Sequence, residues 1–185
     1  DQLDNAAWSK TQSSISANAG VAPDGTSTAD AIVEDSTASS SHLITQASTK
    51  SAVAQDWCGT IALKLSGARS QARLVVGDNT ANFASAYYDL SGGVILSGPT
   101  LAGTATNARA FISALGNGWY QCTLIATIPA SITTGNLLAV YIAVACSSVY
   151  SGNGASNILA WRGAYAASSV PIRLTQTTSA ATAGT

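Results

Sequence analysis

The chain has 185 residues and a mass of 18.5 kDa, which suits one well-buried domain better than two. Only 9% of the residues are charged and the formal net charge is -1, so neither nucleic acid nor an anionic membrane surface is an expected partner. Hydrophobic residues reach 46%, but they occur in short runs among Ser, Thr, Ala and Gly, and we expect a soluble protein without membrane insertion.

Short stretches rich in β-branched residues, bounded by Gly, Asn, Asp and Pro, follow one another along the chain, whereas helical periodicity is nearly absent. We expect strands at Ser13–Asn18, Ala31–Glu34, Ser41–Ser48, Cys58–Leu65, Gln71–Gly77, Ser85–Leu90, Arg109–Leu115, Tyr120–Ile128, Leu137–Ala145 and Ile158–Tyr165. About ten short strands at this spacing predict an all-β fold, a two-sheet antiparallel β-sandwich. A jelly roll is the natural version of this fold.

The alternation of apolar residues within the strands predicts which side chains face the core. From Tyr120 onward every second residue is apolar, which places Tyr120 in the core and Trp119 on the opposite face. The same period buries the aliphatic residues around Tyr141 and turns Tyr141 outward. Tyr87 is also expected to point away from the core, because Tyr88 shares the parity of the core-facing residues.

The end of the chain differs in composition from the rest. Residues 175–185 are almost all Ser, Thr, Ala and Gly, which are too small and too polar to bury much area. We therefore expect a jelly-roll sandwich domain over residues 1–174 and a tail over residues 175–185. The tail is either a linker or an arm that docks on a partner.

The sequence offers little to an enzyme. The single histidine, His42, lies in a Ser-rich stretch, and no nucleophile elbow, zinc-binding motif or phosphate-binding loop occurs. Asp24 with Asp30, and Glu34 with Asp35, could in principle supply the two carboxylates of a glycosidase. The same residues are ordinary turn and capping groups, which is the interpretation we favour, and we expect a protein that is not an enzyme.

An ordered series of turn and aromatic motifs runs through the chain. Two glycines and an asparagine break the backbone just before Trp119 and Tyr120, so a tight turn delivers two aromatic residues to the start of a strand. The other members of the series, in chain order, are Asn5–Lys10, Ala22–Thr26, Thr28–Asp30, Tyr88–Gly93 and Tyr150–Gly154. The series resembles a family of jelly-roll domains, similar to carbohydrate-binding modules and concanavalin A-like, that recur in phage tail and other virion proteins and in glycan-active enzymes.

This resemblance implies a non-catalytic phage virion surface module, in a tail fibre, spike or capsid appendage, that binds glycan or mediates host attachment. Two alternatives stay open: a secreted carbohydrate-binding module of a polysaccharide-degrading enzyme, and a purely structural capsid decoration or fibre domain. The implied partners are a glycan or polysaccharide and other virion proteins. The resemblance also implies that Trp8, Trp119 and Trp161 pack within the sandwich.

A sugar-binding surface needs exposed flat rings, which stack on the C–H faces of the sugar, and short polar side chains, which bond its hydroxyl groups. Among the aromatic residues, those expected on the surface are the ligand-binding candidates, together with two polar partners. The full candidate set is Trp57, Arg73, Asn82, Tyr87, Tyr141 and Tyr150.

Sandwich modules of this kind often hold a structural calcium ion near the chain ends, and carboxylates are the hard oxygen ligands that calcium prefers. Asp24 and Asp30 are the candidate ligands here. Related domains often place an acidic residue a few positions after the tryptophan of the final strand, whereas the stretch Gly163–Ala166 has none. We therefore expect no cofactor, with structural calcium as the alternative.

Few charges and a net charge near zero give the chain little electrostatic protection against association. A tail that cannot form a core of its own becomes ordered only against another surface. We therefore expect a homo-oligomer, such as a trimer, in which the residues from about Thr175 onward dock on a neighbouring copy or on another virion protein.

Overall fold

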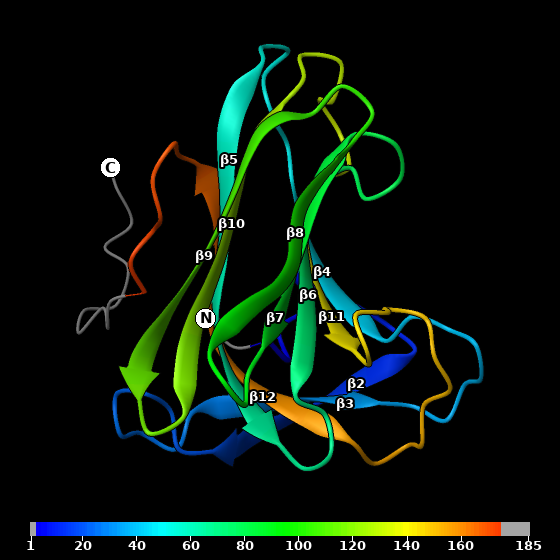
Figure 1. Cartoon of the computed structure of the whole chain (residues 1–185), viewed down its shortest axis with the longest axis vertical. Helices are drawn as coiled ribbons and strands as arrows, with labels where there is room; N and C mark the ends of the chain where they lie inside the picture. The colour runs from blue at the N-terminus through cyan, green and yellow to red at the C-terminus, as the bar shows by residue number, and fades with distance from the viewer. Residues whose placement is uncertain (1–2, 175–185) are drawn as a thin grey trace.

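The computed structural model describes residues 3–174 of the chain (Figure 1). Within these residues, twelve strands form two antiparallel sheets of six strands each, and the sheets pack face to face. The all-β, two-sheet sandwich predicted from the sequence is therefore confirmed. The described residues contain no helix, and hence none with the length and apolar character needed to cross a membrane.

The first sheet begins and ends with strands that the sequence did not predict. Its strands, in spatial order, are β1 (Trp8–Thr11), β4 (Leu43–Ser48), β11 (Asn136–Ala143), β6 (Gln71–Gly77), β7 (Phe83–Asp89) and β8 (Val94–Ala102). β1 has only four residues. β8 contains the dipeptide Gly98-Pro99, which reads as a turn in the sequence. An edge strand tolerates a proline, because its N–H groups need no partner on the open side.

The second sheet contains only strands that the sequence predicted, with ends shifted by a few residues. Its strands, in spatial order, are β2 (Ser13–Gly20), β3 (Ala29–Glu34), β12 (Asn157–Ala167), β5 (Gln55–Ser66), β10 (Trp119–Ile128) and β9 (Thr106–Gly116). The chain passes to the other sheet after β1, β3, β4 and β5, and again after β8, β10 and β11. Such repeated crossing between the sheets is typical of antiparallel β-sandwiches, and the jelly roll stays a prediction.

The inner faces of the two sheets form one apolar core. Tyr88 is completely buried there, and its hydroxyl donates to the backbone oxygen of Thr123 at 2.7 Å, which ties the first sheet to the second. Trp8 lies in this core and Tyr120 packs against it, as expected from the sequence. The large aliphatic residues of the core include Ile32, Ile44, Ile61, Leu63, Leu74, Leu124, Ile128, Leu138, Val140, Ile142 and Ile158.

The chain itself covers part of the outer face of the second sheet. Trp119 and Trp161 are buried on this face, and Leu174 packs against them. The side-chain Nε2 of Gln121 donates to the backbone oxygen of Ile172 at 2.8 Å. The segment that follows β12 therefore lies along the outer side of β5 and β10, as Figure 1 shows on the left of the molecule.

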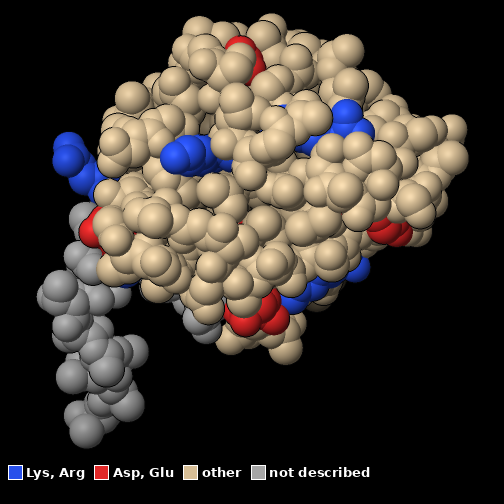
Figure 2. Space-filling view, turned by 90° about the horizontal axis from the view of Figure 1, so that it is seen from below, with Lys and Arg blue, Asp and Glu red and all other residues tan. Residues whose placement is uncertain are grey.

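Charged groups are sparse on the surface. Figure 2 shows one end of the molecule, where a few acidic and basic side chains are scattered over an otherwise uncharged face. The predicted tail, residues 175–185, lies outside the described residues. A domain boundary at residue 174 therefore stays a prediction.

Candidate functional site

A row of large side chains crosses the outer face of the first sheet. In the register of the sheet, Tyr141 of β11 pairs with Arg73 of β6, and Arg73 pairs in turn with Tyr87 of β7. Their neighbours along each strand belong to the core, so these three side chains leave the sheet on the opposite side. The structure thus brings together three of the residues that the sequence predicts as ligand contacts.

Arg73 lies at the centre of what we call the arginine–aromatic face, defined as Arg73, Phe83, Tyr87 and Tyr141. Its guanidinium carbon lies 5.1 Å from the ring centroid of Tyr141, 5.7 Å from that of Tyr87 and 5.8 Å from that of Phe83. A guanidinium within about 6 Å of an aromatic ring centroid is attracted by the ring quadrupole when it lies over the ring face. The three rings therefore hold the cation in place over the sheet.

Tyr141 lies on the predicted face of the sheet but is not an exposed ring. Its exposed fraction is 6%, because it packs against Leu43 and Ala139 and the Arg73 guanidinium lies over its ring. Its hydroxyl donates to the side-chain oxygen of Asn79 at 2.9 Å. The prediction of a surface aromatic at Tyr141 is therefore wrong, because the outer face of the sheet is itself partly packed.

The guanidinium of Arg73 has few polar partners. Its Nη1 donates to the hydroxyl oxygen of Ser148 at 3.3 Å, and its Nε is buried without a hydrogen-bond partner. Within residues 3–174, no carboxylate forms an ion pair with Arg73. The arginine–aromatic face therefore carries a positive charge that this part of the fold does not neutralise.

Hydroxyl groups flank this face on β7 and β8. Ser85, the outward residue between Phe83 and Tyr87, forms a 2.9 Å hydrogen bond with the hydroxyl of Thr100. Ser97 lies opposite Tyr87 in the register of the two strands. Flat rings beside short polar side chains are the combination that a saccharide needs from a protein surface.

The structure places two other candidates away from the arginine–aromatic face. Trp57 is buried between the sheets with an exposed fraction of 6%, and its ring centroid lies 4.8 Å from that of Tyr165, so the expected exposed ring is wrong. Asn82 lies in the loop after β6, where its amide oxygen accepts two hydrogen bonds from Thr104 and its amide nitrogen donates to Asp78. Trp57 is packed inside the protein and Asn82 is hydrogen-bonded within it, so neither side chain joins the arginine–aromatic face.

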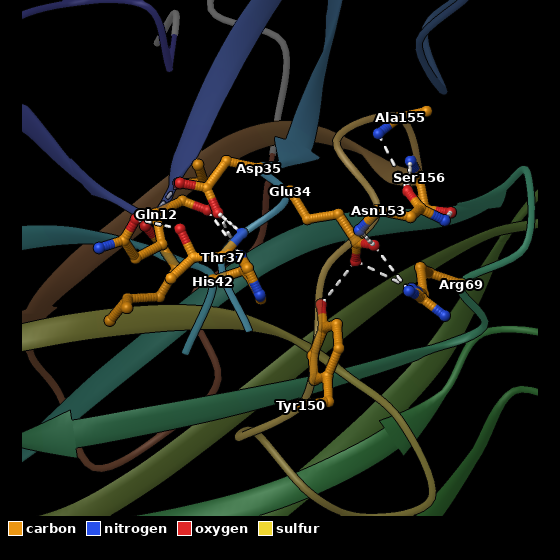
Figure 3. Close-up of polar contacts among 12 residues, drawn as sticks. Gln12, Glu34, Asp35, Thr37, His42, Arg69, Tyr150, Asn153, Ala155 and Ser156 are labelled. Carbon is orange, nitrogen blue, oxygen red and sulfur yellow. Dashed lines mark hydrogen bonds and ion pairs between the residues drawn. The ribbon is translucent and has the colours of Figure 1, made fainter. Parts of the chain in front are cut away.

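Tyr150 belongs to a separate polar cluster, the Glu34 clasp, which we define as Glu34, Arg69, Tyr150 and Asn153 (Figure 3). The side chain of Glu34 is buried at the end of β3, and Arg69 donates to it from Nε at 2.8 Å and from Nη2 at 2.6 Å. The hydroxyl of Tyr150 donates to Glu34 at 2.7 Å, and the backbone N–H of Asn153 donates at 2.9 Å. The clasp joins the loop before β6 to the loop before β12.

These hydrogen bonds determine the charge of Glu34. Burial acts to raise the pKa of Glu34, but the hydrogen bonds from Arg69, Tyr150 and Asn153 favour the ionised form and hold the pKa below its usual value. Burial, and then the hydrogen bond to Glu34, raises the pKa of Tyr150. An ionised carboxylate with four donors is a structural group, and the predicted ligand role of Tyr150 has no support from this position.

His42 lies beside the Glu34 clasp and is completely buried. Its Nδ1 lies 2.7 Å from the backbone oxygen of Gln12, and its ring centroid lies 4.8 Å from that of Tyr150. A Cβ atom on Gly152 would lie 2.6 Å from Cε1 of His42, so the loop fits closely against the ring. This packing leaves no room for a substrate next to the imidazole.

Asp24 and Asp30, the candidate calcium ligands, serve the local backbone. One carboxylate oxygen of Asp30 accepts the N–H of Leu3 at 2.8 Å, and the other accepts the N–H of Asn18 at 2.9 Å. Asp24 accepts the hydroxyl and the N–H of Thr26, and the hydroxyl bond is the main cause of its lowered pKa. In the described part of the chain no three His, Cys, Asp or Glu residues gather in a way that could hold a metal ion. Neither Asp24 nor Asp30 belongs to such a group, and structural calcium stays an untested alternative.

Sequence reasoning missed three residues that belong to or contact the arginine–aromatic face, namely Asn79, Phe83 and Ser148. Phe83 lies four residues before Tyr87 and so points to the same side of β7. Alternation would have placed Phe83 on this face if the predicted strand had begun at Phe83. Asn79 and Ser148 come from loops. No local pattern marks them, because their contacts with the face depend on how the loops fold back over the sheet.

Comparison with known proteins adds no assignment. No model of a known protein family matches the chain, and no curated protein sequence matches it. A functional proposal therefore depends on the fold, on the surface described above and on the motif series in the sequence.

Proposed function

We propose that this chain is a non-catalytic glycan-binding module of a virion surface, with the arginine–aromatic face as its binding site. The observation that carries the proposal is the position of Arg73 among three aromatic rings on the outer face of a sheet. The virion part of the proposal comes from the motif series, which resembles the carbohydrate-binding-module-like domains of phage tail and other virion proteins. The proposed partners are a glycan and other virion proteins.

The open face of a sheet favours weak binding of a sugar chain over tight enclosure of a small molecule. Tyr87 supplies a half-buried ring, and the exposed residue Ser97 supplies a hydroxyl group opposite it. A wet, shallow contact leaves little binding free energy after the loss of translational freedom, so we expect a Kd of about 10 µM to 1 mM. Many copies on one particle would raise the effective affinity.

The absence of catalysis is part of the proposal. The carboxylates that a glycosidase would need have other contacts, because Glu34 holds the clasp and Asp24 and Asp30 accept backbone N–H groups. We expect that incubation with plant, algal and bacterial polysaccharides releases no reducing ends. Release that disappears when Asp24, Asp30 or Glu34 is replaced by its amide would contradict the proposal.

A glycan array followed by calorimetry tests the binding site. We expect Tyr87→Ala to weaken binding of an array-identified sugar about tenfold, because it removes the stacking ring. Phe111→Ala is the matched control, since Phe111 is an aromatic residue with an exposed fraction of 42% on β9 of the other sheet. Unchanged binding by Tyr87→Ala, or an equal loss in Phe111→Ala, would refute the assigned face, and an array without any binding would refute the function.

A structural role within a particle has one specific observation in its favour. The edge strand β8 exposes Val94, Leu96 and Leu101, and it carries no charged residue that would discourage contact with another chain. We propose that the chain forms a homo-oligomer, such as a trimer. Light scattering on the full chain and on a truncation ending at Leu174 tests this, and monomers in both samples at tens of micromolar would contradict it.

A further inference from the structure

The arginines of the chain differ in how the fold neutralises them. Arg69 pairs with Glu34 at 2.6 Å, and Arg109 pairs with Asp56 at 2.6 Å. Arg73 is partly buried, yet it forms no ion pair with any carboxylate that the structure describes. Burying a cation without a counter-ion is unfavourable, and a ligand that supplies the negative charge would remove this penalty.

The two carboxylates nearest to Arg73 along its own hairpin are occupied by loops. Asp78, directly after β6, accepts three backbone N–H groups of the loop that follows. Burial acts to raise its pKa, but these hydrogen bonds outweigh burial and lower the pKa to about 2. Asp89, at the end of β7, accepts the N–H and the hydroxyl of Ser91. Both carboxylates therefore bond their own loops, and neither forms an ion pair with the guanidinium.

The guanidinium also keeps unused hydrogen-bond donors. An arginine side chain carries five N–H donors, and the contacts of Arg73 within residues 3–174 use one of them, from Nη1 to Ser148. Nε is buried, so the Nη groups are the donors that remain for a ligand, and a planar carboxylate can accept two parallel hydrogen bonds from such a fork. The surrounding rings lower the local dielectric constant, which strengthens such an ion pair.

We propose that the glycan bound on the arginine–aromatic face is acidic, with a sugar carboxylate paired to the guanidinium of Arg73 and the pyranose ring against Tyr87. Arg73 supplies the selectivity for charge, and the hydroxyl group of the exposed residue Ser97, opposite Tyr87 in the sheet, bonds a sugar hydroxyl. This inference rests on the proposed function, because it names the class of sugar that the same face binds.

Calorimetry with oligogalacturonate and with its methyl ester tests the inference, because the two ligands share one sugar ring and differ in charge. We expect the parent protein to bind the acid at least about tenfold more tightly than the ester, with a preference that weakens as salt is added. Arg73→Gln is expected to abolish the preference and Arg73→Lys to keep part of it. Arg109→Gln is the matched control and should bind as the parent does, since Arg109 lies on the other sheet.

The outcomes separate this inference from the proposed function. Equal binding of acid and ester by the parent protein, or a preference that survives in Arg73→Gln, would overturn the inference and leave glycan binding intact. Binding of dextran sulfate in place of oligogalacturonate would overturn the choice of a carboxylate. If no saccharide binds, the proposed function fails as well. If Arg73→Gln does not fold, equal binding of acid and ester by the parent protein would still overturn the inference, and a preference undiminished in Arg73→Lys would overturn the role of Arg73.

Discussion

Arg69, in the loop before β6, and Arg73, within β6, both lie near tyrosine rings but differ in their electrostatic surroundings. The guanidinium carbon of Arg69 lies 5.0 Å from the ring centroid of Tyr150, and that of Arg73 lies 5.7 Å from the ring centroid of Tyr87. Arg69 makes two hydrogen bonds to the buried carboxylate of Glu34. Arg73 has no carboxylate partner within residues 3–174.

This difference separates a structural site from a candidate binding site. In the Glu34 clasp, the charge of Arg69 is neutralised by Glu34, and the oxygens of Glu34 accept hydrogen bonds from within the protein. A ligand is not needed to complete this site. On the arginine–aromatic face, the fold supplies rings and a cation but no anion. A partly buried cation without an anion in the described fold is therefore a candidate ligand contact.

The largest effect is expected from Glu34→Gln. The substitution leaves the guanidinium of Arg69 without its counter-ion. The site is buried, since the side chain of Arg69 is 17% exposed and that of Glu34 is 0% exposed. Removing one partner of a buried ion pair destabilises a protein by about 3–5 kcal/mol. Denaturant unfolding measures this loss in the free energy of unfolding.

Arg109→Gln is the control for Glu34→Gln. The ion pair of Arg109 with Asp56 is 43% and 23% exposed, and an exposed pair contributes only about 0–1 kcal/mol. A loss in Glu34→Gln no larger than the loss in Arg109→Gln would mean that the clasp does not hold the two loops together.

Acid should weaken the same clasp. The pKa of Glu34 is lower in the folded state than its ordinary value of 4.5, so the stability that Glu34 contributes is fully present above that pH and is lost as the pH falls through the folded pKa. We expect the free energy of unfolding of Glu34→Gln to fall less between about pH 5 and pH 2 than that of the parent protein. Parallel pH profiles for the two proteins would contradict the assignment.

A smaller loss is expected from Tyr150→Phe. The change removes the 2.7 Å hydrogen bond from Tyr150 to Glu34 and keeps the ring on His42. A hydrogen bond to a charged group contributes about 1.5–3 kcal/mol, and the remaining donors on Glu34 keep the loss near the lower limit. Tyr87→Phe is the control and should change the free energy of unfolding by less than about 0.5 kcal/mol. Thermal and denaturant unfolding that rank the two variants in the reverse order would contradict the comparison.

The smallest effect on stability, and the most distinctive one, is expected from Arg73→Gln. Because this arginine has no carboxylate partner, we expect the free energy of unfolding to stay unchanged or to rise by up to about 1 kcal/mol. Arg69→Gln should instead destabilise the protein by about 3–5 kcal/mol. Losses of equal size in the two variants would show that Arg73 is a structural residue like Arg69.

Strand periodicity predicted most of the sandwich, because each strand of a two-sheet core has one apolar side. It failed where a side chain lay beyond the predicted end of a strand. Trp57 precedes the predicted strand Cys58–Leu65, but β5 begins at Gln55, and Trp57 shares the parity of the core residue Ile61. The strand boundary, rather than the alternation, caused the error.

The candidate site was predictable only in part. Tyr87 follows from alternation, and Arg73, predicted as a polar partner, lies opposite it on the neighbouring strand. Tyr150 was assigned to the surface, and the sequence could not reveal its contact with Glu34. The two residues lie 116 positions apart, and no local pattern indicates such a contact. The unpaired charge of Arg73 is likewise a tertiary property, since it depends on where the loops direct Asp78 and Asp89.

The most direct test of the arginine–aromatic face is an NMR titration that records the Nε–H signals of the arginine side chains while oligogalacturonate is added. We predict that the signal of Arg73 shifts progressively to saturation, because the carboxylate binds its guanidinium. The signal of Arg69 should stay in place, since Glu34 already occupies it. Saturable binding that moves another arginine and leaves the Arg73 signal unchanged would contradict the assignment of the site.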